Sequence, residues 1–417
     1  MIRLSREAPA LIAGAALAIG LAGGAAAQEK KIVIGVQCDR TGPTQIVGTA
    51  LCPGMHDYFS FVNANHLLDG YTVDAPEIDT AYKVPPAVEA YEQQKGEGAV
   101  LMSVYGTPQA HALNERIEKD QIPSTTPGFG IAASADGQKY PYLFPIAASY
   151  FSQGAAAVDF AKKQLGGDLK GKKIAYIYYD NPAGKEPLPV LEALQKQEGF
   201  ELRTFAVPPP GIDVTTQVLD IAQRYQADFV ISHLFGTAPS ASIKEFKRTG
   251  YPLSKVLGLV WASAEGDILK AGGWGVAQGY HTMQFAGAGD DYKIRQDIKA
   301  MYKKDGKEPP KEMEDTVYYN RGVFQAAVQI EALNNALKLT GDKQPTGTDV
   351  KKGMEQIHDF TLGGLVPPLQ ITPEDHEGGG YVRIFQVKGE KLVPETDWFR
   401  AYRDVVLAAV KDAEKQE

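Results

Sequence analysis

The sequence of 417 residues has only two cysteines, no excess of positive charge and, after its first 27 residues, no long hydrophobic run. Two cysteines are too few for a fold held together mainly by disulfides. The 43 Lys and Arg residues are outnumbered by 51 Asp and Glu residues, giving a net charge of -8, which argues against binding nucleic acid through a basic face. A membrane-spanning helix needs about 18 or more consecutive apolar residues. The composition is that of a soluble globular protein.

Common catalytic motifs are also missing. The chain has no G-x-x-x-x-G-K-[ST], no G-x-S-x-G and no H-E-x-x-H segment, and its seven histidines are scattered without metal-ligand spacing. Residues 128–133 match G-x-G-x-x-A, but no clear helix follows them, so a dinucleotide site is not expected there. We therefore expect no metal, no cofactor and no catalytic residue, and we favour binding over catalysis.

The first 27 residues have the three parts of a secretory signal peptide. Arg3 and Arg6 precede an apolar stretch over residues 8–24, and Ala25 and Ala27 supply the small residues of a cleavage site. We expect cleavage after Ala27 and a mature protein in the periplasm. An uncleaved anchor is the alternative, and it is disfavoured because the stretch is short and rich in Gly and Ala.

Cys38 and Cys52 are then expected to be in an oxidising compartment. A bond between them would close a loop of about 15 residues and stabilise the protein by roughly 3 kcal/mol. We favour this disulfide, and two buried thiols that act as small apolar side chains are the alternative. Neither cysteine has a second Cys or His at ligand spacing, so no metal site is expected at either.

Apolar runs of strand length alternate with helical patterns along most of the chain. Continuous apolar strands separated by helices predict the α/β class, with parallel sheets covered on both faces. Right-handed crossovers then place the strand-to-helix loops at one edge, where such sheets bind ligands. The predicted strands cover residues 31–37, 99–104, 122–125, 173–179, 202–207, 229–234, 256–260, 366–372 and 381–388, and the helices 53–65, 109–119, 187–197, 214–225, 238–249, 312–339 and 398–415.

The predicted elements form two sets, with a break near residues 142–152 that indicates two lobes. The first strand and the loop and helix after it, residues 31–54 (KIVIGVQCDRTGPTQIVGTALCPG), resemble the "IGV…TGP…G" start of type I periplasmic solute-binding proteins of the Leu/Ile/Val-binding family. These are the receptors of hydrophobic amino-acid ABC importers. Residues 105–108 (YGTP) resemble the family's Ser/Thr-rich loop, 126–130 (TPGFG) its S-P-x-A-T loop, and 151–154 (FSQG) the segment after its first crossover.

The resemblance extends through nearly the whole mature chain and implies two doubly wound, Rossmann-like α/β lobes joined by three crossover strands. The solute is enclosed when the lobes close. The crossovers are then expected near residues 144–148, 279–285 and 363–369. The implied domains are lobe 1 over residues 28–146 and 284–365, lobe 2 over 147–283 and 366–396, and a C-terminal helix over 397–417.

In amino-acid-binding relatives, backbone amides and hydroxyls of the first lobe hold the carboxylate. A tyrosine and an acidic residue of the second lobe hold the ammonium. Backbone donors suit a carboxylate, and glycine permits their close approach. The resemblance therefore implies carboxylate-side residues at Tyr105, Gly106, Thr107, Gly128 and Gly130.

The second lobe departs from the family pattern. Where relatives have D-x-x-Y-G, residues 180–184 are DNPAG, with Ala183 in place of the tyrosine, and the expected acid is displaced to Glu265. An α-ammonium group would lose its counter-charge, and burying it unpaired is costly. This departure resembles the branch of the family that imports aromatic or other organic acids. An amino-acid ligand stays open as the alternative, with Asp180 or Glu265 reaching the ammonium.

Aromatic side chains fall at loops or crossovers on the expected ligand edge, which suits a flat apolar ring. Core packing between the lobes is the alternative for each. Arg40 follows the first strand and is a candidate partner for a ligand carboxylate, with a surface charge as its alternative. The aromatic candidates are Tyr105, Phe129, Tyr150, Phe235 and Trp261.

The favoured function is a monomeric receptor outside the cytoplasm that hands a small carboxylate to the membrane permease of an ABC importer. A receptor for hydrophobic amino acids is the first alternative. An exported enzyme using the same cleft and a ligand sensor docked to a membrane kinase are two others. Steady-state turnover would identify the enzyme, and a neighbouring kinase gene in place of permease and ATPase genes would identify the sensor.

Overall fold

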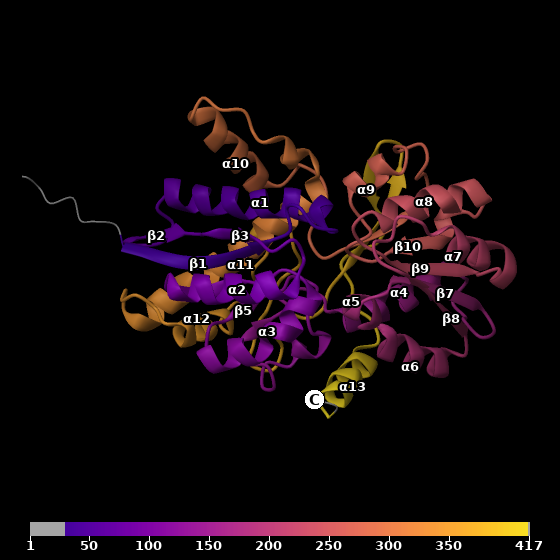
Figure 1. The fold of residues 1–417 in the computed structure, drawn as a ribbon, viewed down its shortest axis with the longest axis horizontal. Helices are drawn as coiled ribbons and strands as arrows, with labels where there is room; N and C mark the ends of the chain where they lie inside the picture. The colour runs from indigo at the N-terminus through magenta and orange to yellow at the C-terminus, as the bar shows by residue number, and fades with distance from the viewer. Residues whose placement is uncertain (1–29, 416–417) are drawn as a thin grey trace, which may run out of the picture.

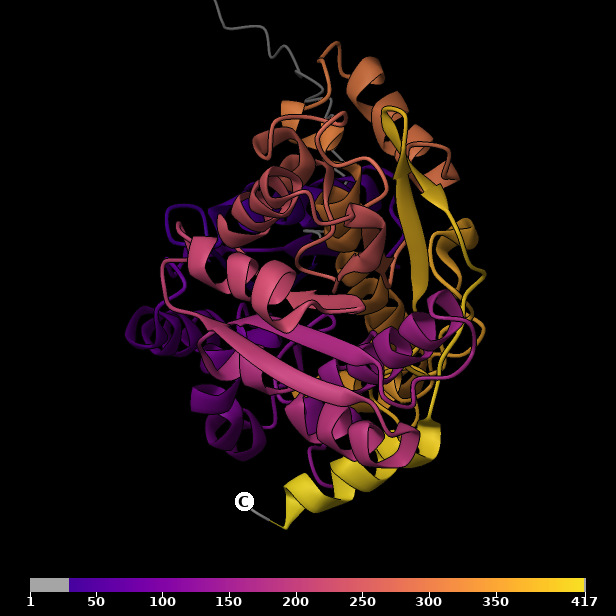
Figure 2. The ribbon, with the colours of Figure 1, turned by 90° about the vertical axis from the view of Figure 1, so that its right-hand side faces the viewer.

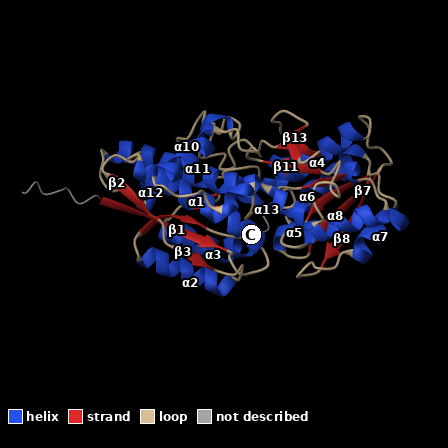
Figure 3. Ribbon diagram, turned by 90° about the horizontal axis from the view of Figure 1, so that it is seen from above, coloured by secondary structure: helices blue, strands red, loops and turns tan. Residues whose placement is uncertain are grey.

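The computed structural model describes residues 30–415, which form two α/β lobes side by side (Figure 1). Each lobe contains one sheet with helices packed around it, as the view from above shows (Figure 3). The predicted two-lobed α/β fold is confirmed. The signal peptide expected over residues 1–27, with cleavage after Ala27, lies outside the described residues.

Lobe 1 has a six-stranded parallel sheet in the order β2-β1-β4-β5-β6, with β3 also paired to β1. Helices α1 and α11 pack closely at Gly322. A side chain there would not fit, since its Cβ would lie 1.8 Å from the carbonyl oxygen of Leu51. The strands are β1 (Lys30–Cys38), β2 (Tyr71–Asp74), β3 (Glu77–Asp79), β4 (Ala99–Ser103), β5 (Ser124–Thr125) and β6 (Leu143–Phe144). The helices are α1 (Gln45–Ala64), α2 (Val84–Gly96), α3 (Thr107–Asp120), α10 (Lys293–Lys304), α11 (Thr316–Thr340) and α12 (Gly347–Met354).

Lobe 2 has a seven-stranded sheet in the order β13-β12-β11-β10-β9-β7-β8. Its strands are parallel except for the hairpin β12–β13, which lies at one edge (Figure 2). The strands are β7 (Lys173–Tyr179), β8 (Glu201–Val207), β9 (Phe229–His233), β10 (Val256–Gly258), β11 (His281–Gln284), β12 (Arg383–Lys388) and β13 (Lys391–Pro394). The helices are α4 (Tyr150–Gln164), α5 (Pro182–Lys185), α6 (Leu188–Glu198), α7 (Thr215–Leu219), α8 (Ala238–Thr249) and α9 (Glu265–Lys270).

Three segments of chain connect the lobes. The first joins β6 of lobe 1 to α4 of lobe 2. The second follows β11 rather than including it, since residues 281–284 belong to the sheet of lobe 2. The N–H of Gly287 then donates to the carbonyl of Leu365 (2.7 Å) on the way to α10.

The third crossover lies later than the predicted residues 363–369. The N–H of Ile371 donates to the carbonyl of Ile357 (2.9 Å), and the N–H of His376 donates to that of Ala135 (2.9 Å). Residues 366–376 therefore lie with lobe 1, and the expected boundary after residue 365 is wrong. The strand predicted over 366–372 is also absent, because Pro367 and Pro368 lack the N–H groups that a ladder requires. Two isolated bridges, Phe360 with Leu369 and Thr372 with Asp375, are formed instead.

Several helix boundaries differ from the sequence prediction. Helix α1 begins at Gln45, well before the predicted start, and carries Pro53 in its interior. Helix α11 begins at Thr316, where the side chain of Asp315 accepts a hydrogen bond from the N–H of Tyr318 (3.2 Å) and caps the helix. Residues 220–225 continue α7 as a π-helical turn.

The C-terminal helix α13 (Arg403–Glu414) is shorter than the helix predicted over residues 398–415. It contacts α4 and α6 of lobe 2 and the short 3₁₀ turn Ala132–Ala135 of lobe 1, and so lies below the junction of the lobes in Figure 1. Its first residue forms an ion pair with Asp375 (3.1 Å). Among residues 30–415, no helix has both the length and the apolar character needed to cross a membrane.

Candidate functional site

A cavity with an empty volume of about 370 Å³ lies between the lobes. Its walls come from loops at the carboxyl ends of parallel strands: β4 leads into Tyr105, β9 into Phe235 and β10 into Trp261. This is the edge at which open α/β sheets bind ligands. The lining residues are Thr44, Val47, Tyr82, Tyr105, Gly106, Thr107, Phe129, Tyr150, Ala183, Phe235 and Trp261.

Aromatic rings from both lobes make most of the wall. The ring of Phe129 in lobe 1 lies 5.6 Å from that of Trp261 in lobe 2, edge to face. Tyr105 is 6.3 Å from Phe129 on one side and 6.3 Å from Tyr82 on the other. Edge-to-face and tilted contacts at these distances are favourable. The rings therefore form a continuous apolar surface that crosses from one lobe to the other.

Hydrogen-bond donors gather at one end of the cavity. Helix α3 begins at Thr107, after Gly106 adopts φ 105°, a backbone conformation that favours glycine. The Oγ1 of Thr107 accepts from the N–H of Gly130 (3.1 Å), and its hydroxyl proton points toward the hydroxyl of Tyr150. Burial raises the pKa of Tyr150 well above its usual value, while Thr107 and Trp261 act in the opposite direction. The Nε1–H of Trp261 is buried and points toward the hydroxyl of Tyr150.

No charged side chain lines this cavity among the described residues. Asp180, one candidate for an ammonium partner, forms an ion pair with Lys185 (2.8 Å). Glu265, the other candidate, accepts hydrogen bonds from the hydroxyl of Thr316 and from the N–H of Val317 (3.1 Å) at the start of α11. Both carboxylates already have partners outside the cavity.

A neutral histidine supports the wall in lobe 2. Burial lowers the pKa of His233 to about 3, so its imidazole is uncharged at neutral pH. The hydroxyl of Tyr176 donates to the carbonyl of Gly184 (2.7 Å), so the Nδ1–H of His233 must donate to the oxygen of Tyr176 (2.9 Å). The imidazole also packs 4.6 Å from the ring of Tyr150. These contacts link helix α5, which carries Ala183, to the ring of Tyr150 in the cavity wall.

Direct contacts between the lobes show that they are closed over the cavity. Glu186 of lobe 2 contacts the imidazole of His111 (2.9 Å) and accepts from the N–H of Ala132 (3.0 Å) in lobe 1. At another point, the N–H of Gly266 in lobe 2 donates to Asp315 of lobe 1 (3.3 Å). The closed state therefore has polar contacts that separation of the lobes would break.

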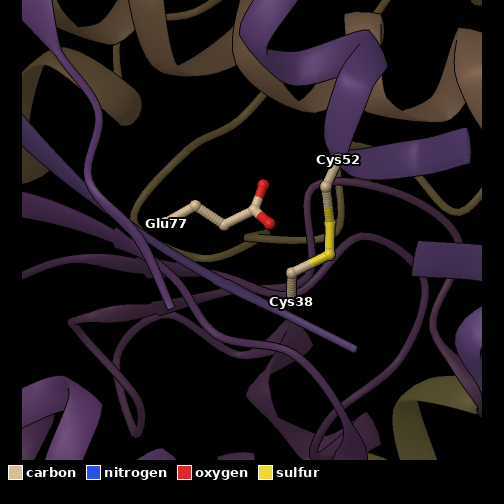
Figure 4. Close-up of side chains that lie close together, drawn as sticks. All are labelled: Cys38, Cys52 and Glu77. Atoms are coloured by element: carbon tan, nitrogen blue, oxygen red, sulfur yellow. A yellow bond between two sulfur atoms is a disulfide. The ribbon is translucent and has the colours of Figure 1, made fainter. Parts of the chain in front are cut away.

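One group of possible metal ligands occurs among the described residues: Cys38, Cys52 and Glu77 (Figure 4). The two sulfur atoms are joined in a disulfide, so neither is a thiolate. Burial raises the pKa of Glu77, but hydrogen bonds from His56 and Arg40 have the larger effect and lower this pKa to about 2. The carboxylate is therefore engaged in ion pairs, and this group does not fit a metal.

A family model described as periplasmic binding protein matches residues 31–391. The chain belongs to the periplasmic binding protein family. None of the curated proteins matches this periplasmic binding protein.

Solved structures similar to this periplasmic binding protein cover most of its length. A protein described as an ABC transporter permease, from the Pseudomonas fluorescens group, is 30% identical, has a TM-score of 0.84 and is matched over 93% of this chain and 97% of its own. A branched-chain amino acid ABC transporter from Thermus thermophilus with bound valine is 21% identical and has a TM-score of 0.79. The match covers 92% of this chain and 99% of that protein. An ABC transporter solute-binding protein from R. palustris in complex with benzoate is 18% identical and has a TM-score of 0.70. The match covers 88% of this chain and 95% of that protein.

These findings place the chain among ABC transporter substrate-binding proteins, which bind a small molecule and are not enzymes. The structures with bound valine and benzoate are below 25% identity and show the fold alone. The family resemblance and the non-enzymatic class predicted from the sequence are confirmed.

Most of the ligand residues predicted for this periplasmic binding protein line the cavity. Three do not. Arg40 donates through Nε and Nη2 to Glu77 (2.7 and 2.8 Å), so its charge is neutralised away from the ligand edge. The N–H of Gly128 donates to the carbonyl of Pro145 (3.0 Å), and that of Gly130 to Thr107. The seven that line the cavity are Tyr105, Gly106, Thr107, Phe129, Tyr150, Phe235 and Trp261.

Sequence reasoning missed Thr44, Val47 and Tyr82. The first two follow the TGP loop after β1, and the same strand-end rule would have found them if the helix had been predicted to start at residue 45. Tyr82 follows β3, a strand of three residues that was not predicted. Without that strand, the sequence does not place the loop of Tyr82 at the ligand edge.

Lobe closure in this periplasmic binding protein is expected to depend on pH. Burial raises the pKa of Asp267 to about 7, and the carboxylate accepts a hydrogen bond from Tyr318 of the other lobe (3.1 Å). Opening would return the carboxyl to water and lower its pKa, so the closed form binds more protons. Ligand affinity should therefore rise by about tenfold as the pH falls from about 8 to about 6.

Titration calorimetry at the two pH values would measure this change. In the Asp267→Asn variant the titrating group is gone, and the affinity should become nearly independent of pH over this range. An unchanged pH dependence in that variant would assign the effect to another group.

Proposed function

We propose that this protein captures a small carboxylate with an aromatic or other apolar body and delivers it to the permease of an ABC importer. The observation that carries the proposal is a cavity with aromatic walls, donors at one end and no charged side chain in its lining. Such a site favours an anion with an apolar body over a zwitterion.

The carboxylate is assigned to the end formed by the start of α3. A helix N-terminus offers unpaired N–H groups and a positive dipole end to an anion. The hydroxyls of Thr107 and Tyr150 and the Nε1–H of Trp261 add donors at this end of the cavity. Hydrogen bonds to a charged acceptor are stronger than neutral ones. Neutral donors are therefore sufficient to hold an anion here.

The ring or other apolar body is assigned to the space between Phe129, Phe235 and Trp261. These side chains come from both lobes, so closing the lobes encloses the ligand on opposite sides. Burial of apolar ligand surface between them is worth about 25 cal/mol per Å². Closure would then be coupled to occupancy, and only the closed form would present both lobe surfaces to the permease.

A receptor for hydrophobic amino acids is the second candidate, supported by the valine bound in the Thermus thermophilus relative. Its ammonium would require an acceptor, and the cavity offers only hydroxyl and carbonyl oxygens. Ala183 does line the cavity at the position where the family pattern has tyrosine. The missing hydroxyl and the engaged carboxylates of Asp180 and Glu265 place this candidate second.

The proposed receptor acts in the periplasm as a monomer, after cleavage of the signal peptide. A ligand sensor docked to a membrane kinase is the alternative role. Genes for a permease and an ATPase beside the gene for this protein would support the importer. A kinase gene in their place would support the sensor.

A thermal-shift screen of the mature protein tests the ligand class. The panel contains benzoate, coumarate, aliphatic carboxylates, leucine, valine and phenylalanine at about 1 mM, with benzamide as the neutral match to benzoate. A ligand at about 100 times its Kd stabilises the native state by about 2.7 kcal/mol, which shifts the Tm by a few degrees. We expect the non-amino carboxylates to raise the Tm and benzamide to have little effect. A shift with leucine or valine but none with benzoate or coumarate would reject the proposal.

A further inference from the structure

Trp261 is the side chain through which lobe 2 meets the aromatic wall of lobe 1. It is 6% exposed and lies against Phe129 of lobe 1 at 5.6 Å. Tyr318 of α11 stacks on its other side, with ring centroids 6.1 Å apart and planes inclined by 20°. The hydroxyl of Tyr318 shares its one proton between the main-chain carbonyl of Trp261 and the carboxylate of Asp267 (3.1 Å to each). The indole position therefore depends on α11, an element of the opposite lobe.

Arg321, one helical turn after Tyr318, contacts the loop of Trp261 at both ends. Its guanidinium donates to the carbonyl of Val260 and to the hydroxyl of Ser263 (3.1 Å), the residues on either side of the Trp261–Ala262 pair. The same guanidinium lies 5.1 Å from the centroid of the indole ring, within the range of a cation–π contact. Main chain and ring of Trp261 are thus held by one side chain.

The guanidinium is fully buried, with 0% of Arg321 exposed. Its hydrogen bonds go to neutral acceptors, and the nearby carboxylates of Asp315, Asp267 and Glu265 stabilise its charge. Burial lowers the pKa of Arg321 to about 10, so it remains charged at neutral pH. Burying a charge is costly, and the neutral acceptors, the ring faces and the neighbouring carboxylates offset part of that cost. A charge kept in such a place points to a positioning role.

The contact also lies beside a crossover. Arg321 donates to the side-chain oxygen of Gln284 (2.5 Å), the last residue of β11 before the chain crosses to lobe 1. The lobes move least relative to one another at the segments that connect them. The contacts of Arg321 with the Trp261 loop therefore lie next to one of the segments that connect the lobes.

We propose that Arg321 is a positioning residue that fixes Trp261 in the cavity wall and thereby sets the fit of the ligand. It does not touch the cavity itself. The part that concerns ligand fit rests on the proposed function. The part that concerns the position of Trp261 does not.

The position of Trp261 is tested first, without ligand. Trp274→Phe and Trp398→Phe leave Trp261 as the only tryptophan of the chain. In this background we expect Arg321→Met to raise the acrylamide quenching constant at least about twofold. Gln325→Met is the matched control, because Gln325 lies on α11, is buried and donates to Thr125 (2.9 Å) without contacting Trp261. Equal quenching in the two variants would overturn the proposal.

The effect on binding is tested with benzoate in a double-mutant cycle, measured by titration calorimetry. Arg321→Met should weaken binding about tenfold in the normal protein but less than about twofold in a Trp261→Ala background. Arg321→Lys should not restore affinity, because the single ammonium of lysine cannot replace the several N–H donors that the planar guanidinium directs at its acceptors. Equal losses in both backgrounds would show that Arg321 acts only through the general stability of the fold.

Two outcomes separate this inference from the proposed function. If the normal protein does not bind benzoate or any other carboxylate of the screen, the proposed ligand class fails, and the quenching measurement still decides the role of Arg321. If Arg321→Met does not fold, Ser263→Ala removes one acceptor of the same guanidinium. It is expected to raise quenching and weaken benzoate binding in the same direction, by about threefold, and no change in either would overturn the proposal.

Discussion

Replacing Trp261 by alanine is expected to weaken ligand binding by about 100-fold. The indole forms the wall of lobe 2 opposite Phe129, and its Nε1–H is the one indole donor of the cavity lining. Truncation removes ring contacts and a hydrogen bond from the centre of a desolvated site, and large aromatic residues in such places contribute about 2 kcal/mol or more. Titration calorimetry with the best ligand of the thermal-shift screen would measure the loss.

The control for this prediction is Trp274→Ala. Trp274 is partly buried in lobe 2, after α9, and does not line the cavity. Its replacement should change the affinity by less than about threefold. Trp261→Phe should lie between the two, because phenylalanine keeps ring contacts and loses the N–H donor. An affinity within threefold of normal for Trp261→Ala would remove this residue from the binding site.

Much of the cavity could be predicted because parallel sheets place their functional loops by a simple rule. Tyr105, Phe235 and Trp261 each follow an apolar strand, and the carboxyl ends of such strands meet at one edge. The rule needs only the strands to be recognised, and β4, β9 and β10 are continuous apolar runs. The alternation of these runs with helices also predicts the fold class without any contact information.

The errors arise where a residue's partner is distant in the sequence. Arg40 follows the correct strand, but Glu77 lies on β3, a short strand of alternating polarity that carries little pattern. The sequence near Arg40 gives no sign that its guanidinium pairs with Glu77 and so lies outside the cavity. Residues 366–372 contain apolar residues at strand-like spacing, yet two consecutive prolines and bonds to lobe 1 keep them out of a sheet.

The roles of Gly128 and Gly130 also could not be decided from the sequence. A glycine-rich segment at a ligand edge fits either a cradle for an anion or a tight turn. Gly128 has φ 68°, and a Cβ there would lie 2.9 Å from the ring of Phe285. Both N–H groups are used by the protein itself. The turn therefore shapes the wall around Phe129 and leaves its two donors unavailable to a ligand.

Removing the disulfide between Cys38 and Cys52 is expected to lower the free energy of unfolding by about 3 kcal/mol. The bond joins the end of β1 to α1 over a sequence separation of 14, and it restricts the unfolded chain more than it adds contacts to the folded one. Denaturant titration of the Cys38→Ala, Cys52→Ala variant against the oxidised normal protein would measure the difference. Both cysteines are fully buried, so mutation is a cleaner test than adding reductant.

The same variant should keep its ligand affinity within about threefold. The loop that the disulfide closes carries Thr44 and Val47 of the cavity, but that loop has a second support. The carboxylate of Asp39 accepts hydrogen bonds from the N–H of Gly42 (2.5 Å) and from both the N–H (2.8 Å) and the hydroxyl (2.6 Å) of Thr44. These short-range bonds fix the loop whether or not the sulfur atoms are joined, since Asp39 is fully buried. Stability and affinity should therefore separate in this variant, whereas a loss of both would show that the disulfide also shapes the ligand edge.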